Sequence, residues 1–85
     1  MTDTFLTAFD ALPLGSFVGT SQGRRYVITQ QDFSNGQSQK LIAEELSGND
    51  YISLNLYRLA TGARLKPCET SEAKVIEFVL NLVLL

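Results

Sequence analysis

The stretch that decides the fold is residues 51–59, YISLNLYRL, in which Ile52, Leu54 and Leu56 alternate with polar or aromatic side chains. Successive side chains of a β-strand point to opposite sides, so alternation with a period of two is typical of a strand with one buried face. Residues 51–59 are therefore predicted to form a strand that places these three apolar side chains against the core.

Short polar pairs that contain glycine flank this strand and recur through the middle of the chain: Gln22-Gly23, Asn35-Gly36, Gly48-Asn49 and Thr61-Gly62. Asn-Gly is a strong hairpin signal, because both turn residues must accept a positive φ. If each pair is a hairpin loop, the chain forms a sequential antiparallel meander of strands 16–20, 24–33, 38–46, 51–59 and 63–66. Pro67 then ends the last strand, and a proline is tolerated at the edge of a sheet.

The loops also predict how the strands pair. A two-residue loop at Asn35-Gly36 places Ile28 opposite Ala43, and one at Gly48-Asn49 places Ala43 opposite Leu54. All the turns then put the apolar side chains on one side of the sheet, called face A here: Phe17, Tyr26, Ile28, Leu41, Ala43, Ile52, Leu54, Leu56 and Leu65. A slip of one residue would divide this set between the two faces, which favours the predicted pairing.

Helices are expected at both ends of the meander. Apolar residues recur at helical spacing before Pro13: Phe5, Leu6, Ala8, Phe9 and Leu12. Thr70 or Ser71 can cap a last helix, whose main apolar stripe is Val75, Ile76, Val79, Leu80 and Val83. The predicted fold class is α+β, a single domain of residues 1–85. It has a five-stranded (at least four) antiparallel β-meander, a short N-terminal helix and a C-terminal helix packed on face A.

Composition narrows the classes of function. The 85 residues carry a formal net charge of −2, whereas a dedicated nucleic-acid binder is usually basic. Cys68 is the only cysteine, so no disulfide can form within the chain and a reducing compartment is expected. No apolar run approaches the roughly 20 residues of a membrane-spanning helix. We expect a cytoplasmic protein with no membrane partner.

The other side of the sheet, called face B, is the first candidate interaction surface. The predicted pairing places there Arg25, Lys40, Tyr51, Asn55, Tyr57, Arg64 and Lys66, with Glu44 as the one carboxylate. Aromatic and basic side chains on a sheet can stack bases and hold phosphates, so single-stranded nucleic-acid binding is one hypothesis. A solvated face is a second interpretation. A protein interface is a third, because four further residues are more apolar than exposure requires: Val18, Val27, Ile42 and Leu46.

The order of at least four antiparallel strands followed by one helix resembles, in architecture alone, the single-strand-DNA-binding transcriptional coactivators. No sequence motif accompanies this resemblance. Likeness at the level of architecture implies no function.

Catalytic chemistry finds little support in the sequence. The chain has no histidine, so Cys68 lacks the usual general base of a cysteine nucleophile. Glu44 and Glu45 are adjacent on a strand and therefore point to opposite faces. We predict no catalytic, cofactor-binding or metal-binding residue, no cofactor and no enzymatic activity. A thiol-dependent redox role of Cys68 is kept as an alternative, because Lys66 and a helix N-terminus close by would favour a thiolate.

The last residues give the second candidate interaction surface. Phe78, Leu82 and Leu85 lie off the main stripe of the expected C-terminal helix, and a helix that is apolar nearly all round is normally buried on more than one side. These three residues are the candidate dimer contact, since homodimers are the commonest oligomers. The favoured hypothesis is a small non-enzymatic interaction or regulatory module that acts as a homodimer and can bind a further protein.

Overall fold

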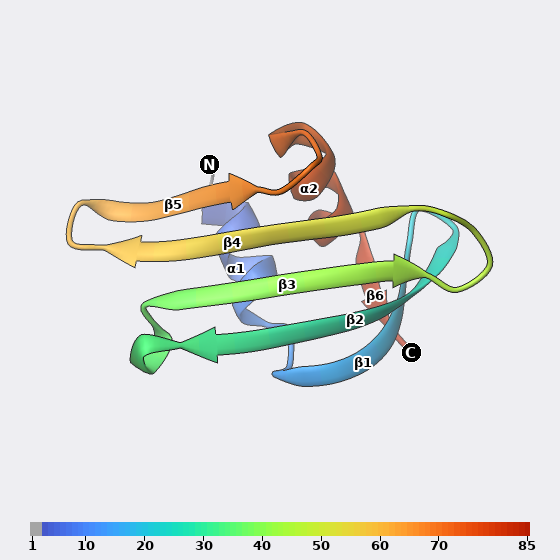
Figure 1. Cartoon of the computed structure of the whole chain (residues 1–85), viewed down its shortest axis with the longest axis horizontal. Coiled ribbons are helices and arrows are strands. Elements are labelled where there is room, and N and C mark those ends of the chain that lie inside the picture. The colour runs from blue at the N-terminus through green and yellow to red at the C-terminus, as the bar shows by residue number, and fades with distance from the viewer. Residues whose placement is uncertain (1–2) are drawn as a thin grey trace.

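The computed structural model describes residues 3–85. The elements follow one another as α1 (Asp3–Asp10), β1 (Gly15–Ser21), β2 (Arg24–Phe33), the 3-10 turn η1 (Ser34–Gly36), β3 (Ser38–Glu45), β4 (Tyr51–Leu59), β5 (Gly62–Pro67), α2 (Glu72–Leu80) and β6 (Leu82–Leu84) (Figure 1). The expected α+β fold is confirmed, because two helices flank a meander of antiparallel strands.

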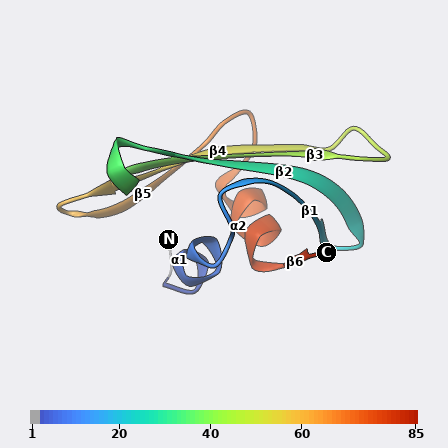
Figure 2. The same cartoon turned by 90° about the horizontal axis from the view of Figure 1, so that it is seen from below.

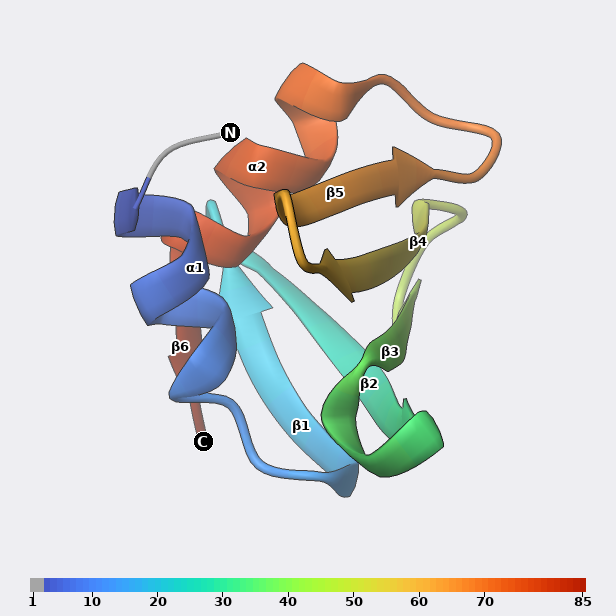
Figure 3. The same cartoon turned by 90° about the vertical axis from the view of Figure 1, so that its left-hand side faces the viewer.

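The strands form one antiparallel sheet in the order β5-β4-β3-β2-β1-β6. Both helices lie on the same side of this sheet. The other side carries no helix or strand in the part of the chain described, although the connection between β5 and α2 passes over it beside β4 (Figure 2). The sheet is strongly curved, so that β1 and β6 swing toward the helices while β5 stays near α2 (Figure 3). No helix within residues 3–85 is long and apolar enough to cross a membrane.

The core lies between face A and the two helices, as expected. Face A contributes fully or nearly fully buried side chains from four strands: Tyr26, Ile28, Leu41, Ala43, Ile52, Leu54, Leu56 and Leu65. The helices contribute Phe5, Phe9, Val75, Phe78 and Val79. The alternation of apolar and polar residues along each strand thus gives the sheet one buried apolar face. Burial of this face fixes the register of the strands.

The pairing of strands is confirmed at one hairpin and corrected at the next. Ile28 lies opposite Ala43 as predicted, but Ala43 lies opposite Ile52 instead of Leu54. The β3–β4 connection spans residues 46–49, because the Glu45 amide donates to the Asp50 carbonyl at 3.0 Å. A four-residue loop in place of a two-residue loop shifts the pairing by two residues. Every side chain therefore keeps its predicted face.

The end of the chain differs from the expectation of one long helix. Helix α2 ends at Leu80, where Asn81 caps it through its backbone and side-chain amides, both of which donate to the Glu77 carbonyl. Residues 82–84 then form β6, which pairs antiparallel with β1. Gly19 permits this pairing, because a Cβ there would lie 2.9 Å from the Val83 carbonyl oxygen.

The buried face of α2 also differs from the predicted stripe. Val75, Phe78 and Val79 are buried, whereas the Leu80 side chain is 41% exposed and Val83 lies on β6. The Phe78 ring packs edge-on against Tyr26 with ring centroids 4.8 Å apart. The expectation that Phe78 points away from the core and toward a dimer partner is therefore wrong. Positions 75, 78 and 79 themselves have helical spacing, so α2 is simply rotated relative to the predicted stripe.

Candidate functional site

The strand pairing brings five of the seven candidate face B residues together at one end of the sheet. Lys40, Asn55 and Lys66 form one row across β3, β4 and β5, and Tyr57 and Arg64 lie side by side in the next row. Neighbouring strands are about 4.8 Å apart, so the two lysines of the row lie about 10 Å apart on either side of the asparagine. These five residues are called the basic end of face B.

The other two candidates lie elsewhere on face B. Tyr51 pairs with Glu44 at the far end of β4, about 20 Å along the strand from Tyr57 at about 3.4 Å per residue. Arg25 pairs with Thr20 at the start of β2. Both side chains are exposed, but neither belongs to the basic end.

Phe33 joins the basic end although the sequence analysis did not include it. It lies opposite Ser38, which in turn lies opposite Tyr57, so two aromatic rings share a row with one strand between them. The Phe33 side chain is 47% exposed and that of Tyr57 is 36% exposed. Its signal was present in the sequence, since Phe33 has the same strand parity as Val27 and Thr29.

Positive charge is concentrated on face B of an acidic chain. Face B carries four of the seven basic residues, namely Arg25, Lys40, Arg64 and Lys66, but only one of the nine acidic residues, Glu44. Three of these four cations belong to the basic end. The net charge of −2 therefore hides a positive face, and a surface of this kind attracts anionic partners.

The part of face B nearest β1 is largely apolar, although Arg25 and Glu44 also lie outside the basic end. Val18 on β1 lies opposite Val27 on β2, and both are partly exposed. Ile42 on β3 lies in the adjacent row, opposite Thr29. Leu46, in the loop after β3, is also exposed. Face B thus divides into an apolar end near β1 and a basic end near β5.

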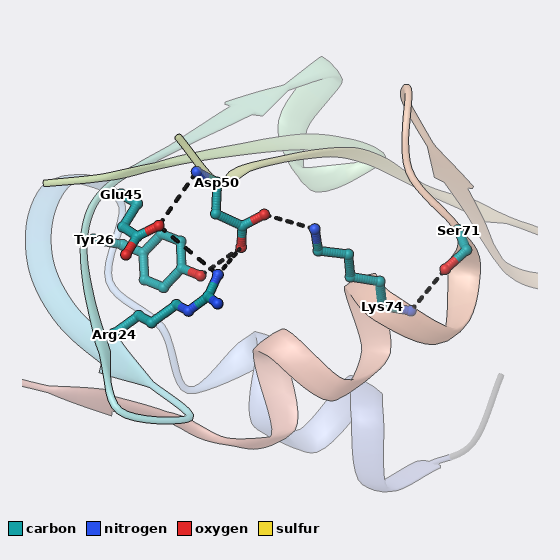
Figure 4. Close-up of polar contacts among 6 residues, drawn as sticks. All are labelled: Arg24, Tyr26, Glu45, Asp50, Ser71 and Lys74. Atoms are coloured by element: carbon teal, nitrogen blue, oxygen red, sulfur yellow. Dashed lines mark hydrogen bonds and ion pairs between the residues drawn. The ribbon is translucent and has the colours of Figure 1, made fainter. Parts of the chain in front are cut away.

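A polar cluster lies at the edge of face A and joins the β3–β4 loop to α2 (Figure 4). The Tyr26 hydroxyl donates to Asp50 Oδ2 at 2.6 Å, and Lys74 Nζ donates to Asp50 Oδ1 at 2.6 Å. The Asp50 amide donates to Glu45 Oε1 at 3.3 Å. Arg24 Nη1 lies 3.9 Å from both carboxylates. Two cations thus balance two carboxylates. This arrangement is typical of a structural link, here between the β3–β4 loop and α2.

The protonation states of this cluster agree with a structural role. Burial, followed by the hydrogen bond to Asp50, raises the pKa of Tyr26 to about 12. The hydrogen bonds from Lys74 and Tyr26 lower the pKa of Asp50. A neutral phenol and an ionised carboxylate are therefore held together over the physiological range, with neither group poised to exchange a proton near pH 7.

Helix α2 begins as the sequence predicts. Ser71 is its N-cap, and the serine Oγ accepts a hydrogen bond from the Lys74 amide at 3.1 Å. This cap sets the first turn of α2, from which Lys74 reaches Asp50.

Cys68 lies in the connection between β5 and α2 and is half-buried. Its amide donates to the Ser53 carbonyl at 2.9 Å, and Asn55 Nδ2 donates to its Sγ at 3.5 Å. The thiol therefore packs beside the basic end of face B, where Asn55 links the two. The redox role of Cys68 stays a prediction.

Within residues 3–85 there is no detected pocket and no group of three potential metal-ligating side chains. Comparison of the chain with protein-family models, with curated proteins and with solved structures finds no match in any of the three. Function is therefore inferred from the geometry and charge of this chain alone.

Proposed function

We propose that this chain is a non-enzymatic binding module, and that the basic end of face B binds single-stranded nucleic acid. The observation that carries the proposal is the gathering of Lys40, Arg64 and Lys66 around exposed aromatic rings on the helix-free face of an acidic protein. A cytoplasmic setting, in which the single thiol stays reduced, belongs to the same proposal.

The arrangement suits an unpaired strand better than a duplex. Phe33 and Tyr57 offer two rings about 10 Å apart, on which unpaired bases can stack, and each stacked base is worth about 1–3 kcal/mol. Lys40, Lys66 and Arg64 surround the Tyr57 ring and are placed to neutralise phosphates. A face several strands wide is broader than the major groove of a duplex, which is about 12 Å wide and admits a helix or a two-stranded ribbon, whereas a flexible single strand can lie across the face (Figure 2).

The test is fluorescence anisotropy with a labelled oligothymidine, titrated at several salt concentrations. We expect saturable binding that weakens as salt rises. Lys40→Gln and Lys66→Gln should each weaken binding and reduce the slope of log K against log salt by about 0.7, the value for one phosphate contact on a single strand. Tyr57→Ala should weaken binding about 5- to 150-fold, as expected for the loss of one stacked base.

The matched control is Lys74→Gln, which makes the same change in net charge on the helix side of the molecule. It should leave the affinity for the oligonucleotide unchanged. Equal losses for Lys74→Gln and Lys40→Gln, or the absence of saturable binding at low salt, would contradict the proposal. Binding of polyglutamate with the same affinity as the oligonucleotide would instead identify an acidic protein as the partner, because polyglutamate carries charge but no bases to stack.

A further inference from the structure

The two edges of the sheet are protected to very different degrees. The β5 edge carries Arg64, Lys66 and Pro67, and charged residues and proline are the usual means by which proteins prevent an edge strand from pairing with another chain. The β6 edge carries none of these, since residues 78–85 contain no charged residue and no proline. Among the described residues, no strand pairs with the outer side of β6.

The hydrogen bonds of β6 show which backbone groups are free. The Leu85 amide donates to the Val18 carbonyl at 3.1 Å, and Val83 lies opposite Thr20 in the same alternation. In an antiparallel pair, residues that exchange hydrogen bonds alternate with residues whose amide and carbonyl point outward. The amides and carbonyls of Leu82 and Leu84 therefore point away from β1, toward the open edge.

We propose that β6 pairs with β6 of a second copy of this chain, antiparallel and about a two-fold axis that passes beside Val83. This arrangement places Leu82 opposite Leu84 of the second copy and Leu84 opposite Leu82 of the second copy. All outward-pointing amides and carbonyls of both residues then find partners, which gives four backbone hydrogen bonds. Any such contact is self-complementary, since a two-fold axis presents the same strand from both sides.

The side chains of β6 are apolar and partly exposed, so contact with a second copy is more favourable for them than contact with water. Val83 is 61% exposed and Leu84 is 45% exposed. A hydrophobic edge strand exposed in this way is a site for pairing. Because no charged side chain lies within residues 78–85, two copies meet there without repulsion between like-charged side chains.

The pairing would join the two sheets into one. A two-fold axis between antiparallel neighbours stands perpendicular to the sheet, so face B of both copies lies on the same side. The apolar end of face B, with Val18 and Val27, then lies near the centre of the joined surface and the two basic ends lie at its extremities. The dimer itself does not depend on what face B binds.

Cysteine cross-linking at the two-fold axis tests the pairing directly. In a Cys68→Ala background, Val83→Cys would place two cysteines in a non-hydrogen-bonded antiparallel pair, where the Cα atoms are about 4.5 Å apart and within disulfide range. We expect mild oxidation to convert most of this variant to a covalent dimer on a non-reducing gel. Leu84→Cys in the same background is the matched control, because position 84 faces position 82 of the second copy. It should cross-link several-fold less.

Sedimentation of the wild-type chain and of Leu84→Pro supplies the second test. The wild-type chain should sediment as a dimer at micromolar concentration. Proline at position 84 removes one outward-pointing amide and leaves the hydrogen bonds to β1 in place, so it should give a monomer with an unchanged circular dichroism spectrum. A monomeric wild-type chain, or equal cross-linking of Val83→Cys and Leu84→Cys, would overturn the proposal. If Leu84→Pro fails to fold, the cross-linking comparison decides alone.

Discussion

Face A and face B are built from alternating residues of the same strands, yet they differ in what they contact. Leu54 and Leu56 of β4 are buried beneath the helices, whereas Tyr57 between β3 and β5 is exposed. Face A has to exclude water for the chain to fold, and face B is left free to carry charge and aromatic rings. Stability and binding should therefore be separable by substitutions one or three residues apart on a single strand.

The largest expected difference between the faces is in stability. Leu54→Ala should lower the free energy of unfolding by about 2–5 kcal/mol, because it opens a cavity in a fully buried site. Tyr57→Ala, on the other face of the same strand, should lower it by about 1 kcal/mol or less. Urea unfolding of both variants measures the difference. Equal losses would mean that face B is also buried, for instance in a dimer that covers it.

The pattern that made face A predictable is local and repetitive. Ile52, Leu54 and Leu56 alternate with polar neighbours, and the flanking turns put partner strands on the same face. This explains why each side chain lies on its predicted face although the loop between β3 and β4 is longer than predicted. A two-residue shift moves Leu54 from Ala43 to Leu41, and both partners point to the same side. Loop length itself was not predictable, because the Glu45–Asp50 hydrogen bond that closes the loop depends on the folded hairpin.

The conformation of the C-terminal residues and the placement of part of the site could not be predicted without the three-dimensional structure. A short apolar run such as residues 82–85 suits a helix or a strand equally well by its pattern. Whether this run forms a strand depends on the open edge of β1 and on the space left by Gly19, and only the assembled sheet provides both. Phe78 was assigned to the wrong side for a related reason, since Tyr26 supplies its partner from a distant strand. The basic end of face B, in contrast, followed from strand parity, and Phe33 could have been added by the same rule.

The second largest effect is expected at alkaline pH and concerns the edge of face A. The pKa of Tyr26 is raised to about 12 by burial and by its hydrogen bond to Asp50, whereas the pKa of an unfolded tyrosine is about 10. Between these values the folded chain keeps a proton that the unfolded chain has lost. The stabilisation that comes from the neutral Tyr26 phenol is therefore fully present below about pH 10. The free energy of unfolding then falls by up to about 3 kcal/mol as the pH rises toward 12.

Tyr26→Phe is the control for this alkaline loss. It should cost about 0.5–1.5 kcal/mol at neutral pH, through the lost hydrogen bond to Asp50, and should reduce the fall in stability between pH 10 and 12. Unfolding free energies measured in urea across this range for both proteins provide the check. The same decline in both would show that groups other than Tyr26 cause the alkaline loss.

A smaller effect is expected from a buried polar side chain of face A that lacks a hydrogen-bond partner among the described residues. Gln30 is buried, and its Oε1 accepts no hydrogen bond within the part of the chain that the structure describes. A buried acceptor without a donor is costly, so Gln30→Met should raise the free energy of unfolding by about 1 kcal/mol. Gln31→Met, on exposed face B, should give no such gain. A loss of stability in Gln30→Met would mean that this side chain has a polar partner after all.

The smallest effect is expected at Cys68, where face B meets the connection to α2. The thiol receives one long hydrogen bond from Asn55 and is half-buried, so Cys68→Ala should change the free energy of unfolding by less than about 1 kcal/mol. Its alkylation by iodoacetamide at pH 6 should be no faster than that of free cysteine. Rapid alkylation at this pH would reveal a thiolate stabilised by the neighbouring cations. Face B would then carry a reactive centre as well as a binding surface, and the redox hypothesis would displace the purely non-enzymatic one.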